Sequence, residues 1–178
     1  MLESLITSKT RVKLLLKFFL NPNTSAYLRG LSNEFGESSN AVRLELNRFE
    51  KAGMLNSKSV GNKKMFQVNK THSLYGPIQH IVQKSIGLDK IIDFVVRSLG
   101  NLETAYLCGD LARGKESDVI DLVLIGSIDR QYLSEAVEKA QSLTGKKIKY
   151  LIYESDEALL KTFSAEDYLL IWEKKPPE

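Results

Sequence analysis

The chain has 178 residues, of which 43% are hydrophobic and 26% charged, so it has the composition of a globular protein with room for one large domain or two small ones. Its apolar runs are too short to cross a bilayer, no signal peptide is expected, and the single cysteine excludes an internal disulfide and a multi-cysteine metal site. We therefore expect a cytoplasmic protein without a membrane partner.

The net charge of +3 is unevenly distributed along the chain. The first 70 residues hold 12 Lys and Arg against 5 Asp and Glu, whereas the remaining residues hold 13 against 17. A basic first part favours a polyanionic partner, although a basic solvated surface without any partner gives the same count.

The first 35 residues show two helical patterns. Apolar residues between positions 12 and 20 recur at helical spacing, and Ser8 is placed to cap that helix. Either Thr24 or Ser25 can cap a second, shorter helix, and Gly36 is placed to end it.

A third helix and a hairpin follow. Ser38 or Ser39 can cap the helix, and strand-like runs at 55–60 and 63–68 are separated by Gly61-Asn62, a two-residue turn signal. The apolar stripe of the helix consists of Val42, Leu46 and Phe49.

Three helices followed by a hairpin make an α+β winged helix-turn-helix over residues 1–70, and the segment 38–55 resembles the recognition helix of bacterial winged-helix transcription regulators. Such a helix enters the major groove of double-stranded DNA and the hairpin contacts the backbone. On the helix face opposite the apolar stripe we expect base contacts, and on the hairpin phosphate contacts. The helix residues are Ser39, Asn40, Arg43 and Asn47, and the hairpin residues are Lys58, Lys63 and Lys64.

A winged helix can also serve as a protein-interaction module, because a fold does not fix a function. Glu45 and Glu50 belong to the same helix and weaken the DNA interpretation unless they lie off the contact face. The basic charge and the Arg-bearing polar face favour DNA.

Residues 71–100 form a helical connector. Apolar residues from Leu74 to Ile86 follow a helical period, Gly87 interrupts it, and Asp89 can cap a second helix that runs to Leu99. Both a homodimer interface and packing between two domains fit this segment. We expect a homodimer, because one winged helix rarely binds a DNA site specifically enough alone.

Residues 101–178 alternate between strand and helix patterns, which predicts a small α/β domain. Strands are expected at 104–108, 121–125 and 148–153, and a helix at 132–143. The segments 157–163 and 168–172 complete the domain as two helices or as a helix and a strand.

The segment 108–126 resembles the active-site segment of minimal nucleotidyltransferases. Gly109, Arg113-Gly114 and Asp121-Leu122-Val123 match that family. Asp110 stands where the family has Ser, Val119 replaces the first metal-binding Asp, and residues 145–153 offer Lys146, Lys147 and Lys149 but no third carboxylate.

These departures affect the metal chemistry of the resembled family. Asp118 and Asp121 are three residues apart, so on a regular strand they face opposite sides, unless a bulge turns Asp118 inward. Without the Asp-x-Asp pair the segment lacks the charge density that two-metal transfer needs. We therefore expect no catalytic residue, no metal and no cofactor.

The segment can still form a vestigial site for a nucleotide or another small anion. Its residues are Gly109, Asp110, Arg113, Lys115, Asp118 and Asp121. The sequence thus predicts a DNA-binding transcription regulator whose second domain is a sensor or assembly module. Two alternatives remain: a metal-dependent nucleotidyltransferase targeted by its winged helix, and a protein-interaction module.

Overall fold

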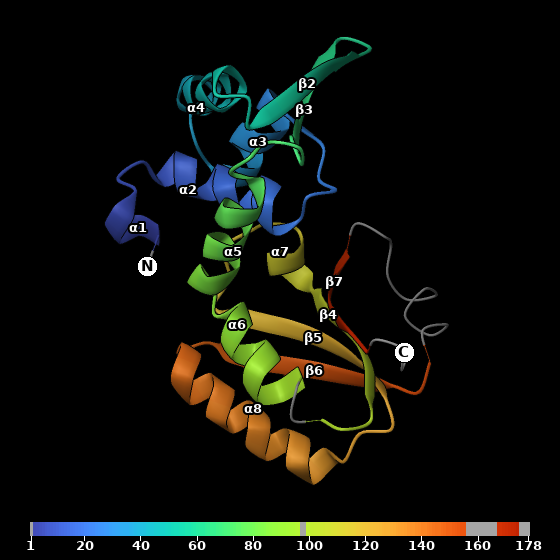
Figure 1. The fold of residues 1–178 in the computed structure, drawn as a ribbon. Coiled ribbons are helices and arrows are strands. Elements are labelled where there is room, and N and C mark those ends of the chain that lie inside the picture. Colours follow the sequence, from blue (N-terminus) through green and yellow to red (C-terminus); the bar gives the residue numbers. More distant parts are fainter. Residues whose placement is uncertain (1, 97–98, 156–166, 175–178) are drawn as a thin grey trace. The chain divides into compact units, whose positions relative to one another are not determined.

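A computed structural model of the chain describes residues 2–96, 99–155 and 167–174 (Figure 1). Its contacts divide the chain into two units, Met1–Ser85 and Ile86–Glu178. Each unit contains one sheet, so the chain is a mixed α+β protein. No helix among the described residues is long and apolar enough to span a membrane.

Unit 1 begins with a short helix that the sequence does not predict, and the helical segments after it lie in the regions where the sequence predicts helices. The Ser8 hydroxyl caps α2 by accepting a hydrogen bond from the backbone N–H of Arg11, and Ser38 caps α4 through Ala41 in the same way. The segments are α1 (Leu2–Leu5), α2 (Lys9–Leu15), the π-helical η1 (Leu16–Leu20), α3 (Leu28–Phe35) and α4 (Ser39–Lys51).

The predicted cap of α3 by Thr24 or Ser25 is wrong. Ala26 and Tyr27 form the short strand β1 (Ala26–Tyr27), which pairs with Phe66 and Met65, and α3 begins only at Leu28. Sheet pairing with a distant segment holds these two residues extended and delays the start of the helix.

The hairpin of unit 1 lies where the sequence predicts it. Strands β2 (Leu55–Val60) and β3 (Lys63–Val68) pair antiparallel, and the sheet order is β1-β3-β2. Gly61 has φ +59° in the connecting turn, a conformation that favours glycine. The largest fully buried side chains of this unit are Leu14, Phe18, Phe19, Leu20, Leu31, Leu46 and Leu55.

The connector predicted at 71–100 is shared between the units. Helix α5 (Tyr75–Ser85) belongs to unit 1, whereas α6 (Leu88–Ile91) and the π-helical η2 (Ile92–Val96) belong to unit 2. Asp89 does not cap α6, because Gly87 occupies the cap position with φ +83°. A Cβ atom at Gly87 would lie 2.8 Å from the Thr144 methyl group, so glycine permits a close approach there.

The sheet of unit 2 has the order β6-β5-β4-β7. Strands β5 and β6 run parallel, and β4 is antiparallel to both β5 and β7. Residues 168–172 are therefore part of a strand, while 157–163 lie outside the described residues. The strands are β4 (Leu102–Cys108), β5 (Val119–Gly126), β6 (Lys147–Tyr153) and β7 (Tyr168–Glu173).

Two helices complete unit 2. The short α7 (Gly109–Ala112) follows β4 directly, and α8 (Arg130–Thr144) is capped by Asp129, whose carboxylate accepts hydrogen bonds from two backbone N–H groups. Helices α6 and α8 lie on the same face of the sheet (Figure 1). The strand side chains at Cys108, Val123 and Ile125 form a separate buried cluster, packed against Tyr106, Tyr153 and Tyr168.

Candidate functional site

The outward face of α4 carries the side chains expected to contact DNA. Ser39, Asn40, Arg43 and Asn47 are exposed. Their inward neighbours Val42, Leu46 and Phe49 are at most 8% exposed. The helical period of the sequence thus separates a polar face from the core of unit 1.

A groove of about 520 Å³ lies between α4, the start of α3 and the β2–β3 hairpin. Four cationic side chains line it: Arg29, Arg43, Lys63 and Lys64. The Lys63 ammonium also lies 4.3 Å from the centre of the Tyr27 ring, which orients it at the groove. A concave surface of this charge attracts an anionic partner.

The groove gathers four of the seven residues predicted to contact DNA, namely Arg43, Asn47, Lys63 and Lys64. Ser39, Asn40 and Lys58 are exposed but do not line it. Sequence reasoning missed Tyr27, Arg29 and Asn62. The signal that could have identified Arg29 is its own positive charge near the start of the second predicted helix.

Glu45 lies on the buried face of α4, with an exposed fraction of 5%. Its carboxylate accepts hydrogen bonds from Ser8, Arg11 and Arg48, the shortest being 2.8 Å. Burial alone would raise the pKa of Glu45, but the hydrogen bonds and charges of Arg11, Ser8 and Arg48 outweigh it and lower the pKa. Glu45 therefore belongs to the packing of unit 1 and lies off the outward face.

Glu50 is also engaged within unit 1. It accepts a hydrogen bond from Lys64 at 2.7 Å and another from Ser57, and the bond from Lys64 is the main cause of its lowered pKa. The carboxylate joins the end of α4 to the hairpin. Lys64 is therefore partly neutralised, so the positive charge of the groove comes mainly from Arg29, Arg43 and Lys63.

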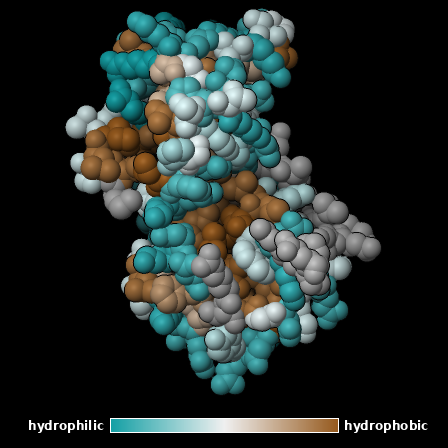
Figure 2. All heavy atoms as spheres, in the orientation of Figure 1, coloured by the Kyte–Doolittle hydropathy of each residue, from teal (hydrophilic) through white to brown (hydrophobic). Residues whose placement is uncertain are grey.

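The surface of unit 1 differs between its ends. Figure 2 shows mostly hydrophilic residues over α4 and the hairpin, whereas hydrophobic residues gather over α1. Leu5 in α1 is 75% exposed. The polar end coincides with the basic groove.

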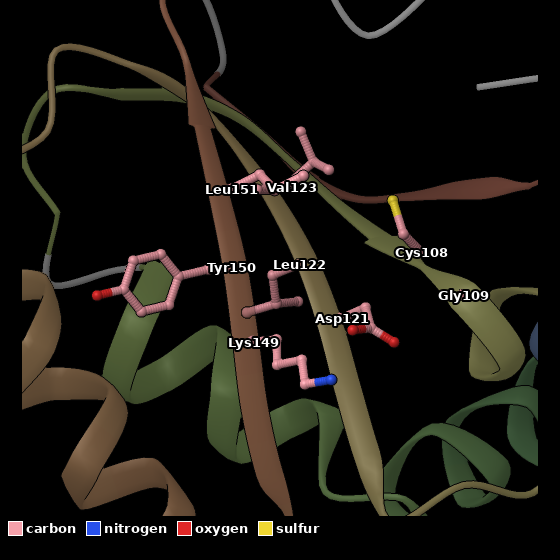
Figure 3. Close-up of a pocket in the computed structure, with 8 residues that line it drawn as sticks. All are labelled: Cys108, Gly109, Asp121, Leu122, Val123, Lys149, Tyr150 and Leu151. Atoms are coloured by element: carbon pink, nitrogen blue, oxygen red, sulfur yellow. The ribbon is translucent and has the colours of Figure 1, made fainter. Parts of the chain in front are cut away.

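Unit 2 has a pocket of about 430 Å³ on its sheet (Figure 3). Cys108, Asp121 and Lys149 stand side by side on β4, β5 and β6, because Asp121 is the register partner of both neighbours. The pocket is lined by Cys108, Gly109, Asp121, Leu122, Val123, Lys149, Tyr150 and Leu151.

Of the predicted vestigial nucleotide site, Gly109 and Asp121 line this pocket and the others do not. Asp110 and Arg113 are exposed on and just after α7, and Lys115 follows them in the next turn. The Arg113 guanidinium pairs with Asp167 at 2.7 Å. Arg113 is thus engaged by a carboxylate that sequence reasoning did not consider.

Asp118 lies outside the pocket. It precedes β5, its side chain is fully exposed, and the Lys146 ammonium lies 3.6 Å from its carboxylate. The pairing of β5 with β6 runs without a shift from Val119 to Ile125, so no bulge in this ladder turns Asp118 inward. Among the described residues, no group of three or more His, Cys, Asp or Glu is arranged to hold a metal ion.

The thiol of Cys108 is buried beside the pocket. Burial raises its pKa to about 12, and the negative charges of Asp121 and Asp167 contribute to the rise. The thiol is therefore protonated at neutral pH, and it packs in a buried cluster with Val123 and Ile125.

No protein-family model matches the chain, and no curated protein is similar to it. Solved structures are similar to part of it. A chain from a complex of a tri-AMPylated HEPN toxin with an MNT antitoxin from Shewanella oneidensis is 17% identical, with a TM-score of 0.39 over 51% of this chain and 73% of that one.

Two further solved structures have a comparably low sequence identity and TM-score. A chain from a toxin–antitoxin structure with AMP-PNP is 19% identical, with a TM-score of 0.41 over 49% of this chain and 73% of that one. The protein AF1382 from Archaeoglobus fulgidus is 18% identical, with a TM-score of 0.37 over 52% of this chain and 94% of its own. A likeness this distant supports no statement about function.

Proposed function

We propose that the protein is a DNA-binding transcription regulator, in which unit 1 is a winged helix-turn-helix and unit 2 a non-catalytic, nucleotidyltransferase-like sensor or assembly domain. The observation that carries this proposal is the basic groove between α4, α3 and the hairpin. Double-stranded DNA presents the dense negative charge that such a groove attracts.

In this proposal α4 occupies the major groove. Arg43 and Asn47 are one helical turn apart and both exposed, so they can reach neighbouring base edges, Arg towards guanine and Asn towards adenine. Ser39 and Asn40 at the start of the helix approach bases or a phosphate. Lys58, Lys63 and Lys64 on the hairpin contact the backbone.

The positions of Glu45 and Glu50 support DNA over a protein partner. The Glu45 carboxylate pairs with Arg11 and Arg48, and the Glu50 carboxylate pairs with Lys64. These contacts lower both pKa values, so neither residue adds an unpaired negative charge to the groove. These two acids therefore place no unpaired carboxylate in the groove, although Glu50 partly neutralises Lys64. A homodimer fits this function, because two half-sites supply the specificity that one module lacks.

The alternative, metal-dependent nucleotidyl transfer, needs clustered carboxylates around the substrate phosphates. In unit 2 the cross-strand neighbour of Asp121 is the cation Lys149, and Asp118 points into solvent. This arrangement supports a domain without that chemistry.

Binding of the full chain to duplex DNA tests the proposal. A site enriched from random duplexes is titrated at several salt concentrations by fluorescence anisotropy. We expect Arg43→Ala to weaken binding to that site by about 1–3 kcal/mol, and Lys63→Ala to reduce the salt slope by about one with little change in sequence preference.

Lys84→Ala is the matched control, because Lys84 is exposed in unit 1 but does not line the groove. It is expected to bind like the unaltered chain. Equal DNA binding by Arg43→Ala and Lys84→Ala would show that the contact face is assigned wrongly. Absence of any salt-dependent DNA binding would leave the protein-interaction alternative.

A further inference from the structure

The pocket on the sheet of unit 2 places two opposite charges next to each other. Asp121 on β5 and Lys149 on β6 are register partners of a parallel ladder, so their side chains leave the sheet on the same side, from strands about 4.8 Å apart. Figure 3 shows both side chains at one end of the pocket. The ion pairs among the described residues do not include one between these two groups.

The other end of the pocket is apolar. Val123 and Leu151 stand two residues further along the same strands and are also register partners, about 6.6 Å from the charged pair. Val123 is 1% exposed and forms a floor, whereas Leu151 is 51% exposed and leaves apolar surface to cover. The pocket is thus charged at one end and apolar at the other.

Gly109 shapes the charged end. It begins α7 with φ +69°, and a Cβ atom there would lie 3.3 Å from the Asp121 carboxyl carbon. The absence of a side chain leaves the Asp121 carboxylate in place at the pocket. This gives the glycine a role that does not require phosphates.

We propose that this pocket binds an α-amino acid with a large apolar side chain. The ligand's ammonium group faces Asp121, its carboxylate faces Lys149, and its side chain lies on Val123 and Leu151. One carbon carries both charged groups of such a ligand, which suits charges on neighbouring strands. The volume of about 430 Å³ lies within the range of small-molecule sites, roughly 300–1,000 Å³.

Charge selects this ligand class over others. A metal-free phosphate ester would place negative charge against Asp121, and a simple amine would place positive charge against Lys149. A zwitterion satisfies both partners at once. Such a ligand would bind to unit 2 whether or not unit 1 binds DNA.

The test is isothermal titration of the full chain, without DNA, with L-leucine and L-phenylalanine. The comparison ligands are 4-methylpentanoate, 3-methylbutylamine, glycine and MgATP. We expect saturable binding of at least one of the two amino acids, and binding weaker by about tenfold or more for the acid alone, the amine alone and glycine.

Lys149→Gln and Asp121→Asn should each weaken amino-acid binding by about tenfold or more. Lys147→Gln and Asp118→Asn are the matched controls. Lys147 is on β6 with Lys149, and Asp118 directly precedes β5, which carries Asp121. Both variants should bind the amino acid like the unaltered chain. Lys149 is exposed, so its variant keeps the fold, which Trp172 fluorescence verifies.

Three results would overturn the inference: no binding of leucine or phenylalanine, amino-acid binding that Lys149→Gln leaves unchanged, or MgATP binding that depends on Asp121 in place of amino-acid binding. Because DNA is absent from the titration, a failure to bind amino acids does not contradict the proposed DNA binding. A failure to bind DNA likewise does not contradict amino-acid binding by unit 2.

Discussion

At the scale of single residues, Glu45 ties two helices of unit 1 together. Its carboxylate is bound by Ser8 and Arg11 at the start of α2 and by Arg48 one turn along α4. Hydrogen bonds to a buried charge each stabilise a fold by about 1.5–3 kcal/mol, and losing the charge leaves its partners unsatisfied. The Glu45 side chain thus links the start of α2 to α4.

Glu45 predicts how the stability of unit 1 depends on pH. The pKa of Glu45 in the folded chain is below its ordinary value of 4.5, so the unfolded chain binds this proton more readily. The contribution of Glu45 to the free energy of unfolding is therefore complete above the ordinary value and is lost as the pH falls through the lowered one. Urea unfolding, followed through amide NMR signals of α2 and α4 at pH 7 and pH 3, measures the loss.

Glu45→Gln should lower the free energy of unfolding of unit 1 by about 1–3 kcal/mol at pH 7 and flatten its decline towards pH 3. Glu37→Gln is the control, since Glu37 pairs with Lys13 at a more exposed position. It should cost well under half as much. An unchanged pH profile in Glu45→Gln would contradict the structural role given to Glu45.

At the scale of elements, two glycines of unit 2 share a positive φ but differ in their surroundings. Gly126 ends β5 with φ +137°, and a Cβ atom there would collide with the backbone at Asn101 and Glu103. Gly145 ends α8 with φ +68° in open space. The first glycine permits two backbone segments to approach, whereas the second only permits a turn.

This difference predicts that replacing each glycine by alanine lowers the free energy of unfolding of unit 2 by a different amount. Gly126→Ala should destabilise unit 2 by about 3 kcal/mol or more, because backbone must move, and Gly145→Ala by about 1 kcal/mol, because only conformational strain is added. Urea unfolding monitored by Trp172 fluorescence measures both. Equal costs would show that β4 and β5 do not meet at Gly126 as described.

The same scale shows what the sequence predicts well. The hairpin bounds 55–60 and 63–68 follow from alternation and a two-residue turn, which are local signals. The cap at Thr24 or Ser25 fails because β1 pairs with residues about 40 positions away, and Asp89 fails because Gly87 adopts a left-handed conformation. Local sequence patterns therefore identify a helix or strand, whereas its exact first and last residues also depend on contacts with distant segments.

The candidate sites divide in the same way. The outward face of α4 follows from one helical period, so the exposed positions of Arg43 and Asn47 can be predicted from the sequence. The neighbours of Asp121 depend on strand order and on a parallel ladder to β6, which no local pattern encodes. The pairing of Arg113 with Asp167, 54 residues away, is equally out of reach of a local pattern.

At the scale of the whole molecule, the two units differ in charge. Residues 1–85 hold 13 Lys and Arg against 5 Asp and Glu, and residues 86–178 hold 12 against 17. Each unit has its own sheet and its own buried side chains. The chain therefore combines a basic body and an acidic one.

We expect the two units to unfold at different urea concentrations. The single tryptophan, Trp172, lies on β7 and reports unit 2 alone, whereas far-ultraviolet circular dichroism reports both units. The transition seen by fluorescence should therefore be narrower than, and displaced from, the one seen by circular dichroism. Coincident single transitions would show that the units unfold together.

The anchoring of Glu45 has a consequence for how the protein can diversify. With the inward face of α4 joined to Ser8 and Arg11 at the start of α2, the helix cannot rotate about its axis without breaking that anchor. Positions 40, 43 and 47 on the outward face carry none of this constraint. Substitutions at those three positions therefore change the outward face of α4 while the contacts that hold its inward face stay the same.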